Sequence, residues 1–176
     1  SYSNEYVTKT ITYSNIQCSL YRVASNEIRY ISTPEDLKNM DGGYYYELTN
    51  DIDLSGIEWL GNEFNGVFDG KGYSIENMSF VGTVKNTSAS LGLFSEGYGV
   101  IQNLNIKEAT VIAEITSDDG SNYNAICGAI LGYSEFMILD NCTVDEYSIL
   151  TVKNNVGGAY VGGLMGSGYA IITNCS

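Results

Sequence analysis

The stretch Ile101-Gln102-Asn103-Leu104-Asn105-Ile106 has apolar residues two positions before an asparagine, one position after it and three positions after it. Successive side chains of a straight strand point to opposite faces, so the apolar face changes at the asparagine. A chain that turns a corner there keeps all three apolar side chains inside. Asparagine tolerates the left-handed conformation of such a corner better than most residues. The stretch therefore predicts two strands joined by an asparagine corner.

The same spacing occurs three more times along the chain. The other copies are Ile75-x-Asn77-Met78-x-Phe80, Leu139-x-Asn141-Cys142-x-Val144 and Ile172-x-Asn174-Cys175. Recurring corners with apolar flanks indicate strands that stack in successive turns. We therefore predict an all-β fold, a parallel three-sided β-helix (β-solenoid), in which three strand segments recur in each turn. One of the three is rich in small residues and comprises Gly92–Ser95, Ala129–Gly132 and Gly163–Gly166. We assume a right-handed coil, because crossover connections between parallel strands are strongly biased that way.

Three regions follow one another along the chain. Residues 1–31 contain alternating stretches that predict leading strands without the corner pattern. Residues 32–43 predict a short capping helix over the first turn, with Thr33 as N-cap and Pro34 in the first helical turn. Residues 44–176 predict the stacked turns. We expect these turns to continue beyond Ser176 in a parent protein, so that the uncapped C-terminal edge promotes self-association.

Composition excludes several classes of partner. The 176 residues are 44% hydrophobic and 16% charged, which is typical of a folded chain. A net charge of −13 argues against nucleic acid and anionic membrane surfaces, since like charges repel. No stretch approaches the ~20 apolar residues of a membrane span. The sequence shows no secretory leader, so we expect either a cytoplasmic chain or one whose leader has been removed, and the acidic, polar surface favours the second.

The four cysteines do not have a metal-binding spacing, and the chain contains no histidine. Cys142 and Cys175 occupy the same repeat position and are predicted to stack on neighbouring turns, ~4.8 Å apart, within disulfide range. Side chains in a parallel stack point the same way, which favours buried, unbonded thiols over a disulfide. We expect neither a metal site nor a resident cofactor on this evidence.

Two glycine–leucine segments each precede an asparagine corner. They are Gly163-Leu164-Met165-Gly166 followed by Ile172–Cys175, and Gly92-Leu93-Phe94-Ser95 followed by Ile101–Leu104. These segments resemble the bacterial GLUG-motif repeats. Residues 50–72 are similar to the segment that commonly precedes such repeats, so the resemblance covers about residues 30–176. It departs from the pattern at Ser95 and Ala129, and in one extra residue between Gly132 and Asn141. These departures are expected to alter corners locally and to leave the architecture unchanged.

Proteins with these repeats are mostly large secreted or wall-anchored proteins of Gram-positive and gut bacteria. They include adhesins and the non-catalytic region of immunoglobulin-A-cleaving metalloproteases. The resemblance implies an extracellular module of the bacterial cell surface, with signal peptide and anchor outside this chain. It implies no particular ligand.

Three aspartates are candidates for chemistry. Asp51 and Asp53 lie on one face of a predicted strand, and Asp69 lies in a glycine-rich turn. Paired carboxylates can serve glycoside hydrolysis or bind calcium. The sequence context favours a structural role, in which these carboxylates cap turns. The recurrent asparagines are likewise interpreted as a ladder of side-chain amides that bond from turn to turn.

The 117–124 loop is a further candidate calcium site. Asp118, Asp119, Asn122 and Asn124 supply oxygen ligands, but their spacing matches no calcium-loop template. A solvated loop is therefore the favoured interpretation, and calcium is the only cofactor considered.

Tyrosine is abundant, with 15 copies. Tyr44, Tyr45, Tyr46 and Tyr123 are candidates for presenting rings to a sugar or a protein surface. The favoured interpretation is that these rings cover the flanks and loops of the coil. Trp59 is predicted to pack under the first turns.

The leading functional hypothesis is a non-enzymatic module that adheres to a host glycan or protein. One alternative is a structural stalk or spacer, and another is a non-catalytic, substrate-positioning region of a secreted protease. A glycan-active enzyme is less favoured, because the chain has no histidine and only eight scattered lysines and arginines. No catalytic or metal residue is assigned, and the ligand-binding residues stay unassigned. The 117–124 insertion favours binding over a spacer.

Overall fold

The structure, a computed structural model, describes residues 7–8, 11–13, 16–18, 22–23 and 27–176, with side chains from Glu27 onward. It contains one short helix, α1 (Pro34–Lys38), and twenty strands. In chain order the strands are β1 (Val7–Thr8), β2 (Ile11–Tyr13), β3 (Ile16–Cys18), β4 (Arg22–Val23), β5 (Ile28–Ile31), β6 (Tyr44–Leu48), β7 (Ile52–Asp53), β8 (Asn62–Asp69), β9 (Ser74–Glu76), β10 (Ser79–Lys85), β11 (Ala89–Leu91), β12 (Phe94–Gln102), β13 (Asn105–Lys107), β14 (Thr110–Thr116), β15 (Ala125–Gly128), β16 (Leu131–Asp140), β17 (Thr143–Val144), β18 (Ile149–Asn154), β19 (Ala159–Gly162) and β20 (Met165–Thr173).

Four parallel sheets make up the body of the molecule. Their strand orders are β20-β16-β12-β8-β6-β5, β17-β13-β9-β7, β10-β14-β18 and β11-β15-β19. Two further pairs, β1 with β4 and β2 with β3, are antiparallel. The chain visits the four large sheets in a fixed sequence: β8, β9, β10 and β11 form one turn, and β12 to β15 and β16 to β19 form the next two. The predicted all-β fold with parallel strands is confirmed.

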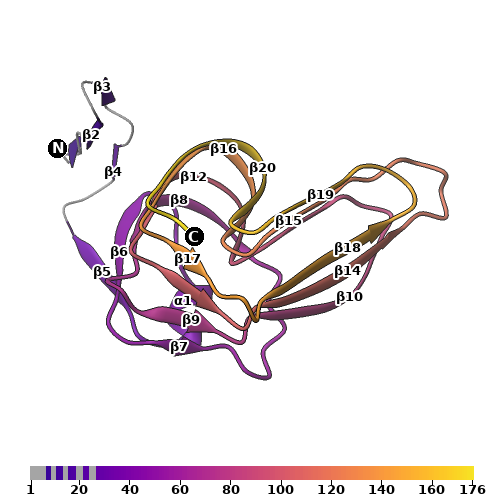
Figure 1. Cartoon of the computed structure of the whole chain (residues 1–176), viewed down its shortest axis with the longest axis horizontal. Coiled ribbons are helices and arrows are strands. Elements are labelled where there is room, and N and C mark those ends of the chain that lie inside the picture. The colour runs from indigo at the N-terminus through magenta and orange to yellow at the C-terminus, as the bar shows by residue number, and fades with distance from the viewer. Residues whose placement is uncertain (1–6, 9–10, 14–15, 19–21, 24–26) are drawn as a thin grey trace, which may run out of the picture.

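The three-sided cross-section is not confirmed, because each complete turn contributes four strands. The segments Gly92–Ser95, Ala129–Gly132 and Gly163–Gly166, interpreted from sequence as strands, begin with bends that lead into β12, β16 and β20. The additional strands, β11, β15 and β19, precede these bends. Figure 1 shows the result, a section with one wide and one narrow lobe. The narrow lobe is built from β10, β14 and β18 facing β11, β15 and β19. The right-handed coil stays a prediction.

The asparagine corners have the predicted backbone conformation. Asn77, Asn103, Asn141 and Asn174 have φ values of 58°, 53°, 53° and 55°. However, only the last three lie in one column, as the pairing of Gln102, Asp140 and Thr173 shows. Asn77 lies one corner further on, between β9 and β10, where its backbone N–H donates to the Lys107 carbonyl.

A single apolar cluster runs through the turns. Three phenylalanine side chains from the neighbouring strands β8 and β12 are in contact in this cluster. The Phe64 and Phe94 rings stack with centroids 4.6 Å apart, and the Phe68 ring contacts Phe94 edge-on, with centroids 5.6 Å apart. Trp59 is buried among the first turns, as predicted, and its indole Nε1 donates to the Leu93 carbonyl at 2.8 Å. The aromatic rings of the core therefore hold neighbouring turns together by packing and by the Trp59 hydrogen bond.

Helix α1 lies within the predicted 32–43 segment. Thr33 caps it: the Thr33 hydroxyl accepts from the Asp36 backbone N–H at 3.1 Å, and the Asp36 carboxylate accepts from the Thr33 N–H at 2.9 Å. This reciprocal pair is a capping box. Leu37 is fully buried in the core cluster, and Met40 packs against it. Strand β5, which precedes the helix, pairs with β6 in the six-stranded sheet. The predicted leading strands lie partly outside the described residues.

The extra residue between Gly132 and Asn141 is absorbed as predicted, without a change of architecture. Gly97 of β12 pairs with Ser134 and Tyr98 pairs with Phe136, so Glu135 has no partner in β12. One additional residue in a paired strand makes a β-bulge, which bends the strand and changes which side chains face outward. Both Glu135 and Phe136 are exposed as a result. In the described part of the chain, no helix has the length and apolar character needed to cross a membrane.

Candidate functional site

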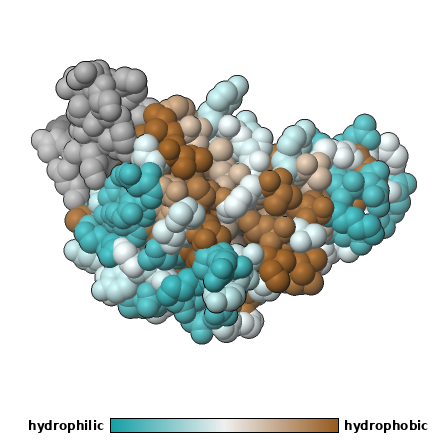
Figure 2. Space-filling model, in the orientation of Figure 1, coloured by the Kyte–Doolittle hydropathy of each residue, from teal (hydrophilic) through white to brown (hydrophobic). Residues whose placement is uncertain are grey.

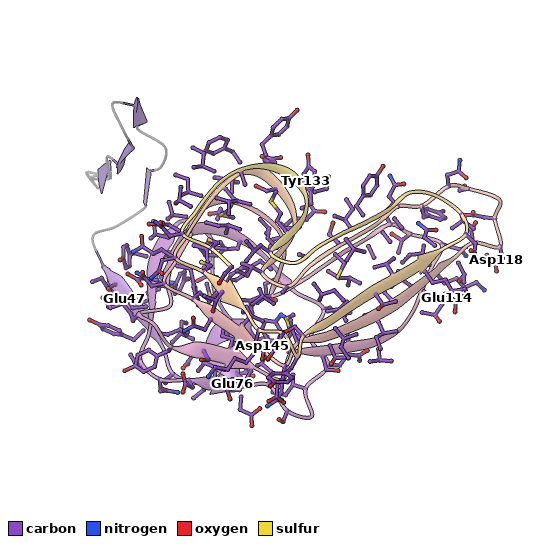
Figure 3. The ribbon with its side chains drawn as sticks, in the orientation of Figure 1. Glu47, Glu76, Glu114, Asp118, Tyr133 and Asp145 are labelled. Atoms are coloured by element: carbon purple, nitrogen blue, oxygen red, sulfur yellow. The ribbon has the colours of Figure 1, made fainter. Side chains whose placement is uncertain are left out.

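A cleft of about 150 Å³ opens on the outer face of the six-stranded sheet, near the start of β8, β12 and β16. Three successive turns contribute to its walls. The lining residues are Glu63, Phe64, Asn65, Glu96, Gly97, Tyr98, Tyr133 and Glu135. Figure 3 shows Tyr133 beside the bend of β16. The cleft is therefore a product of the coil, since no single turn supplies it.

Strand register brings these side chains together. Glu96 pairs with Glu63 of the preceding turn and with Tyr133 of the following turn. Alternation along β8 and β12 points Glu63, Glu96 and Tyr98 away from the core. The bulge at Glu135 adds a carboxylate to the same wall. Gly97 lies between Glu96 and Tyr98, where a Cβ would overlap the Phe64 carbonyl, so glycine at this position allows β12 to lie close to β8.

The cleft is acidic. Neighbouring strands in a sheet lie ~4.8 Å apart, so Glu63 and Glu96 place like charges close together. Five basic side chains form salt bridges with carboxylates outside the cleft. The pairs are Arg29–Asp41, Lys71–Glu47, Lys85–Asp118, Lys107–Glu76 and Lys153–Glu114. Within residues 27–176, therefore, no salt bridge neutralises the three cleft glutamates. Carboxylates gathered in a concave surface attract and hold cations.

The aspartates singled out from the sequence bond to turns of the backbone. Asp51 accepts from the Ser74 backbone N–H at 2.7 Å, which links it to the next turn. Asp53 accepts from the Ser55 N–H at 2.9 Å and from the Asn77 amide at 2.8 Å. This is the turn-capping arrangement that the sequence favoured, and the structure does not bring these carboxylates into the cleft.

Asp69 is buried at the first corner of the asparagine column. Its carboxylate accepts from the side-chain amides of Asn103 and Gln102 at 2.9 and 2.7 Å, and from the Lys71 backbone N–H at 2.9 Å. Burial opposes the charge, but these hydrogen bonds outweigh it and hold the pKa of Asp69 below its ordinary value. Burial, followed by the charge of Asp69, raises the pKa of Tyr45 to about 12.

The predicted amide ladder is present in part. The Asn141 amide donates to the Asn103 side-chain oxygen at 2.9 Å, which joins two turns. Asn174 instead donates to Asp140 at 2.9 Å, and Asn77 donates to Asp53. The corners therefore combine one amide–amide bond with bonds from Asn103, Asn174 and Asn77 to carboxylates of the preceding turn.

Asp69 predicts a measurable dependence of stability on pH. Because its pKa is lower in the folded chain than in the unfolded chain, ionisation of Asp69 stabilises the fold above the ordinary value of about 3.8. That contribution is lost as the pH falls through the folded pKa. We expect the free energy of unfolding of the wild type to fall more steeply between pH 5 and pH 3 than that of Asp69→Asn, measured by urea denaturation. Parallel curves for the two proteins would contradict this role.

The 117–124 loop is held by hydrogen bonds within the loop and by bonds to neighbouring segments. Asp118 pairs with Lys85 at 2.7 Å, and Asp119 accepts from Ser117 at 2.8 Å and from the Tyr123 hydroxyl at 2.7 Å. These donors, with the Tyr123 hydroxyl first, lower the pKa of Asp119 to about 2. Asn124 accepts from the Gly158 N–H at 2.9 Å, whereas Asn122 is exposed. Within the described residues, no group of three or more acidic, cysteine or histidine side chains is arranged for a metal. The solvated loop that the sequence favours, with calcium binding as its alternative, stays a prediction.

The tyrosines named from the sequence take part in packing. Tyr46 is buried, and its hydroxyl donates to the Asp41 carbonyl at 2.9 Å. The Arg29 guanidinium lies 3.3 Å from the Tyr44 ring centroid, and the Tyr45 hydroxyl donates to Asp69 at 3.3 Å. The structure thus gives these three rings the covering role that the sequence favoured. The cleft tyrosines, Tyr98 and Tyr133, were not singled out.

The stacked cysteines are unbonded, as predicted. Cys142 and Cys175 lie on neighbouring turns with free thiols, and the Cys142 backbone N–H donates to the Cys175 sulfur at 3.3 Å. Burial raises the pKa of Cys142 to about 12 and that of Cys127 to about 11. Thiols held protonated in this way are poor nucleophiles.

Comparison with known proteins adds little to this description. No family model and no curated protein matches the chain. A crystal structure of a "putative immunoglobulin A1 protease" from Bacteroides ovatus is 18% identical, over 83% of this chain and 74% of that chain, with a TM-score of 0.29. A TM-score this low carries no argument. The chain's own structure defines its class, an all-β protein of parallel sheets, and the likeness to GLUG-motif repeats stays a resemblance.

Proposed function

We propose that the chain is a non-enzymatic, extracellular β-solenoid module of a bacterial surface protein, and that it binds a basic segment of a host protein. The observation that carries this proposal is the cleft lined by Glu63, Glu96, Glu135, Tyr98 and Tyr133. A lysine or arginine side chain that enters it meets carboxylates for charge-assisted hydrogen bonds. The same side chain meets tyrosine rings, which attract cations over their faces.

The charge of the whole chain supports the same class of ligand. A net charge of −13 draws basic surfaces toward the molecule and repels acidic ones. A neutral glycan could stack on the tyrosines and donate hydroxyl hydrogen bonds to the carboxylates, but it would leave their negative charge uncompensated. A stalk needs no cleft of this composition. These alternatives are outcomes of the experiment below.

The test is a titration of the purified chain against host matrix and mucosal proteins and against glycans, with and without calcium. We expect saturable binding to a basic protein that weakens with added salt, since exposed charges are screened. Tyr133→Ala is expected to weaken it at least about tenfold, the loss typical of a central aromatic contact. Glu135→Gln is expected to weaken it and to reduce its salt dependence.

Tyr147→Ala is the matched control, because Tyr147 is 69% exposed and lies outside the cleft. It should bind as the wild type does. Equal loss in Tyr133→Ala and Tyr147→Ala would remove the cleft from the proposal. Binding that needs calcium would move the site to the 117–124 loop, and binding to glycans alone would replace the protein ligand. Silence across every ligand would favour a spacer.

A further inference from the structure

The cleft on the six-stranded sheet has room for a single side chain. Its volume of about 150 Å³ is half the lower limit of the ~300–1,000 Å³ that is usual for pockets of drug-sized ligands. An oligosaccharide or an element of secondary structure does not enter a space of this size. A protein ligand is therefore anchored here through one side chain, and the chemistry of the walls decides which side chain that is.

Carboxylates flank the Tyr133 ring in two directions. Strand pairing places Tyr133 beside Glu96, and Glu96 beside Glu63, so two carboxylates follow the ring across the sheet. Glu135 follows Tyr133 along β16 itself and is exposed there at the bulge. The partner of Tyr133 on β20 is Ser167, whose side chain is too short to cover a ring. Tyr133 is half-buried, so part of its ring is accessible from the cleft.

The surface near this ring is only weakly polar. Figure 3 places Tyr133 beside the bend of β16, and in Figure 2 the surface near that bend is pale. The deep teal of the most hydrophilic residues gathers instead at the tip of the narrow lobe and along the lower margin of the wide lobe. A cation that reaches the bend therefore meets ring surface as well as carboxylates.

The chain holds one of its own arginines with the same kinds of group. The Arg29 guanidinium lies 3.3 Å from the Tyr44 ring centroid, and it donates to the Asp41 carboxylate at 3.1 Å. A second hydroxyl, that of Tyr46, lies 3.5 Å from the same nitrogen. Four lysines, by contrast, each pair with one carboxylate, and none of the four lies over a ring. They are Lys71, Lys85, Lys107 and Lys153.

We propose that the side chain held in the cleft is an arginine of the ligand, and that Tyr133 is the residue that distinguishes it from lysine. This inference rests on the proposed function, because it names the residue that the cleft selects within a basic segment. A guanidinium is planar and weakly hydrated, so it lies on a ring while its N–H groups reach carboxylates on two sides. A lysine ammonium is a compact, strongly hydrated charge. The same carboxylates attract it, but it gains less from the ring.

The test is an NMR titration of the full, isotope-labelled chain with three Gly-Ser peptides that differ at one central residue. That residue is arginine, lysine or citrulline, which has the shape of arginine without its charge. We expect the arginine peptide to shift the amide signals of Glu96, Tyr133 and Glu135. We expect it to bind about tenfold more tightly than the lysine peptide, which is within the range of a partly desolvated cation–π contact. The citrulline peptide should bind no better than the lysine peptide, because it offers the carboxylates no charge.

Substitutions of Tyr133 separate the ring from the charge. Tyr133→Leu removes the ring, and it is expected to lower the affinity of the arginine peptide to that of the lysine peptide. Tyr133→Phe keeps the ring and should keep the preference for arginine. Glu135→Gln should weaken both peptides together, because both carry the charge that Glu135 attracts. The measured quantity is a ratio of two affinities in one protein, so a general loss of stability does not imitate the expected result.

The wild-type ratio needs no variant to fold, and its outcomes are distinct. Equal affinities for the arginine and lysine peptides would overturn the choice of arginine and leave the proposed function in place. No binding by either peptide would overturn both. A preference for arginine that is unchanged in a folded Tyr133→Leu protein would overturn the role given to Tyr133.

Discussion

Phe94→Ala is expected to destabilise the protein by about 3–5 kcal/mol, the range for removing a fully buried phenylalanine ring. Phe94 is 0% exposed and stacks on Phe64 with centroids 4.6 Å apart, while Phe68 meets it edge-on at 5.6 Å. These rings lie in successive turns, so the loss includes aromatic contacts as well as buried area. The strands on either side are hydrogen-bonded and cannot collapse into the cavity. The measurement is urea denaturation followed by far-UV circular dichroism.

Phe136→Ala provides the control, because it removes the same ring from a position that is 37% exposed, beside the β16 bulge. It is expected to cost less than half as much. Domains of this size are stable by only about 5–15 kcal/mol, so Phe94→Ala should leave a protein close to its unfolding midpoint at moderate temperature. Equal losses for the two variants would mean that the stacked rings do not stabilise the turns.

The corners of the fold were predictable because a corner is a local event. Three apolar positions around an asparagine require a change of face, and the backbone of Asn77, Asn103, Asn141 and Asn174 has the predicted conformation. The column in which each corner lies was not predictable from that spacing. Asn77 has the same flanks as the others but stands one corner further on, where the following turn has Glu108 at a φ of 52°. Register depends on contacts between turns, which the sequence pattern does not contain.

The fourth sheet was missed for a compositional reason. Its strands are short and rich in small residues, as in Ala89–Leu91 and Ala125–Gly128, so they do not show the β-branched alternation that marks a strand. The sequence pattern instead predicts strands in the segments that follow them, which begin at Gly92, Ala129 and Gly163. Gly92 and Leu93 are in fact a bend, where a Cβ on Gly92 would press against the Gly128 carbonyl of the next turn. Glycine there allows the turns to approach at a corner.

The cleft could not be found from the sequence, because its residues are far apart along the chain. Glu63, Glu96 and Tyr133 meet only through strand register, and Glu135 joins them only because a bulge absorbs the extra residue of β16. The available signal was weak. Each of two strands places a tyrosine and a glutamate two positions apart, Glu96 with Tyr98 and Tyr133 with Glu135. Three consecutive tyrosines, Tyr44–Tyr46, are a more conspicuous sequence pattern than these pairs. In the structure, however, Tyr46 is buried and its hydroxyl is bonded to the Asp41 carbonyl.

Gly99→Ala is the second substitution with a large expected effect, and it tests how closely the turns stack. Gly99 pairs with Gly66 of the preceding turn, and its φ of 131° is a conformation that side chains rarely adopt. A Cβ on Gly99 would overlap the Gly66 carbonyl, which is fixed in the sheet. Backbone strain and overpacking together predict that the free energy of unfolding falls by about 3 kcal/mol or more.

Gly163→Ala is the control, because nothing lies within 4 Å of a Cβ there. It is expected to be neutral or slightly stabilising, since alanine restricts the unfolded chain. If thermal unfolding gave both variants the wild-type midpoint, the separation between β8 and β12 would have to be wider than the one described here.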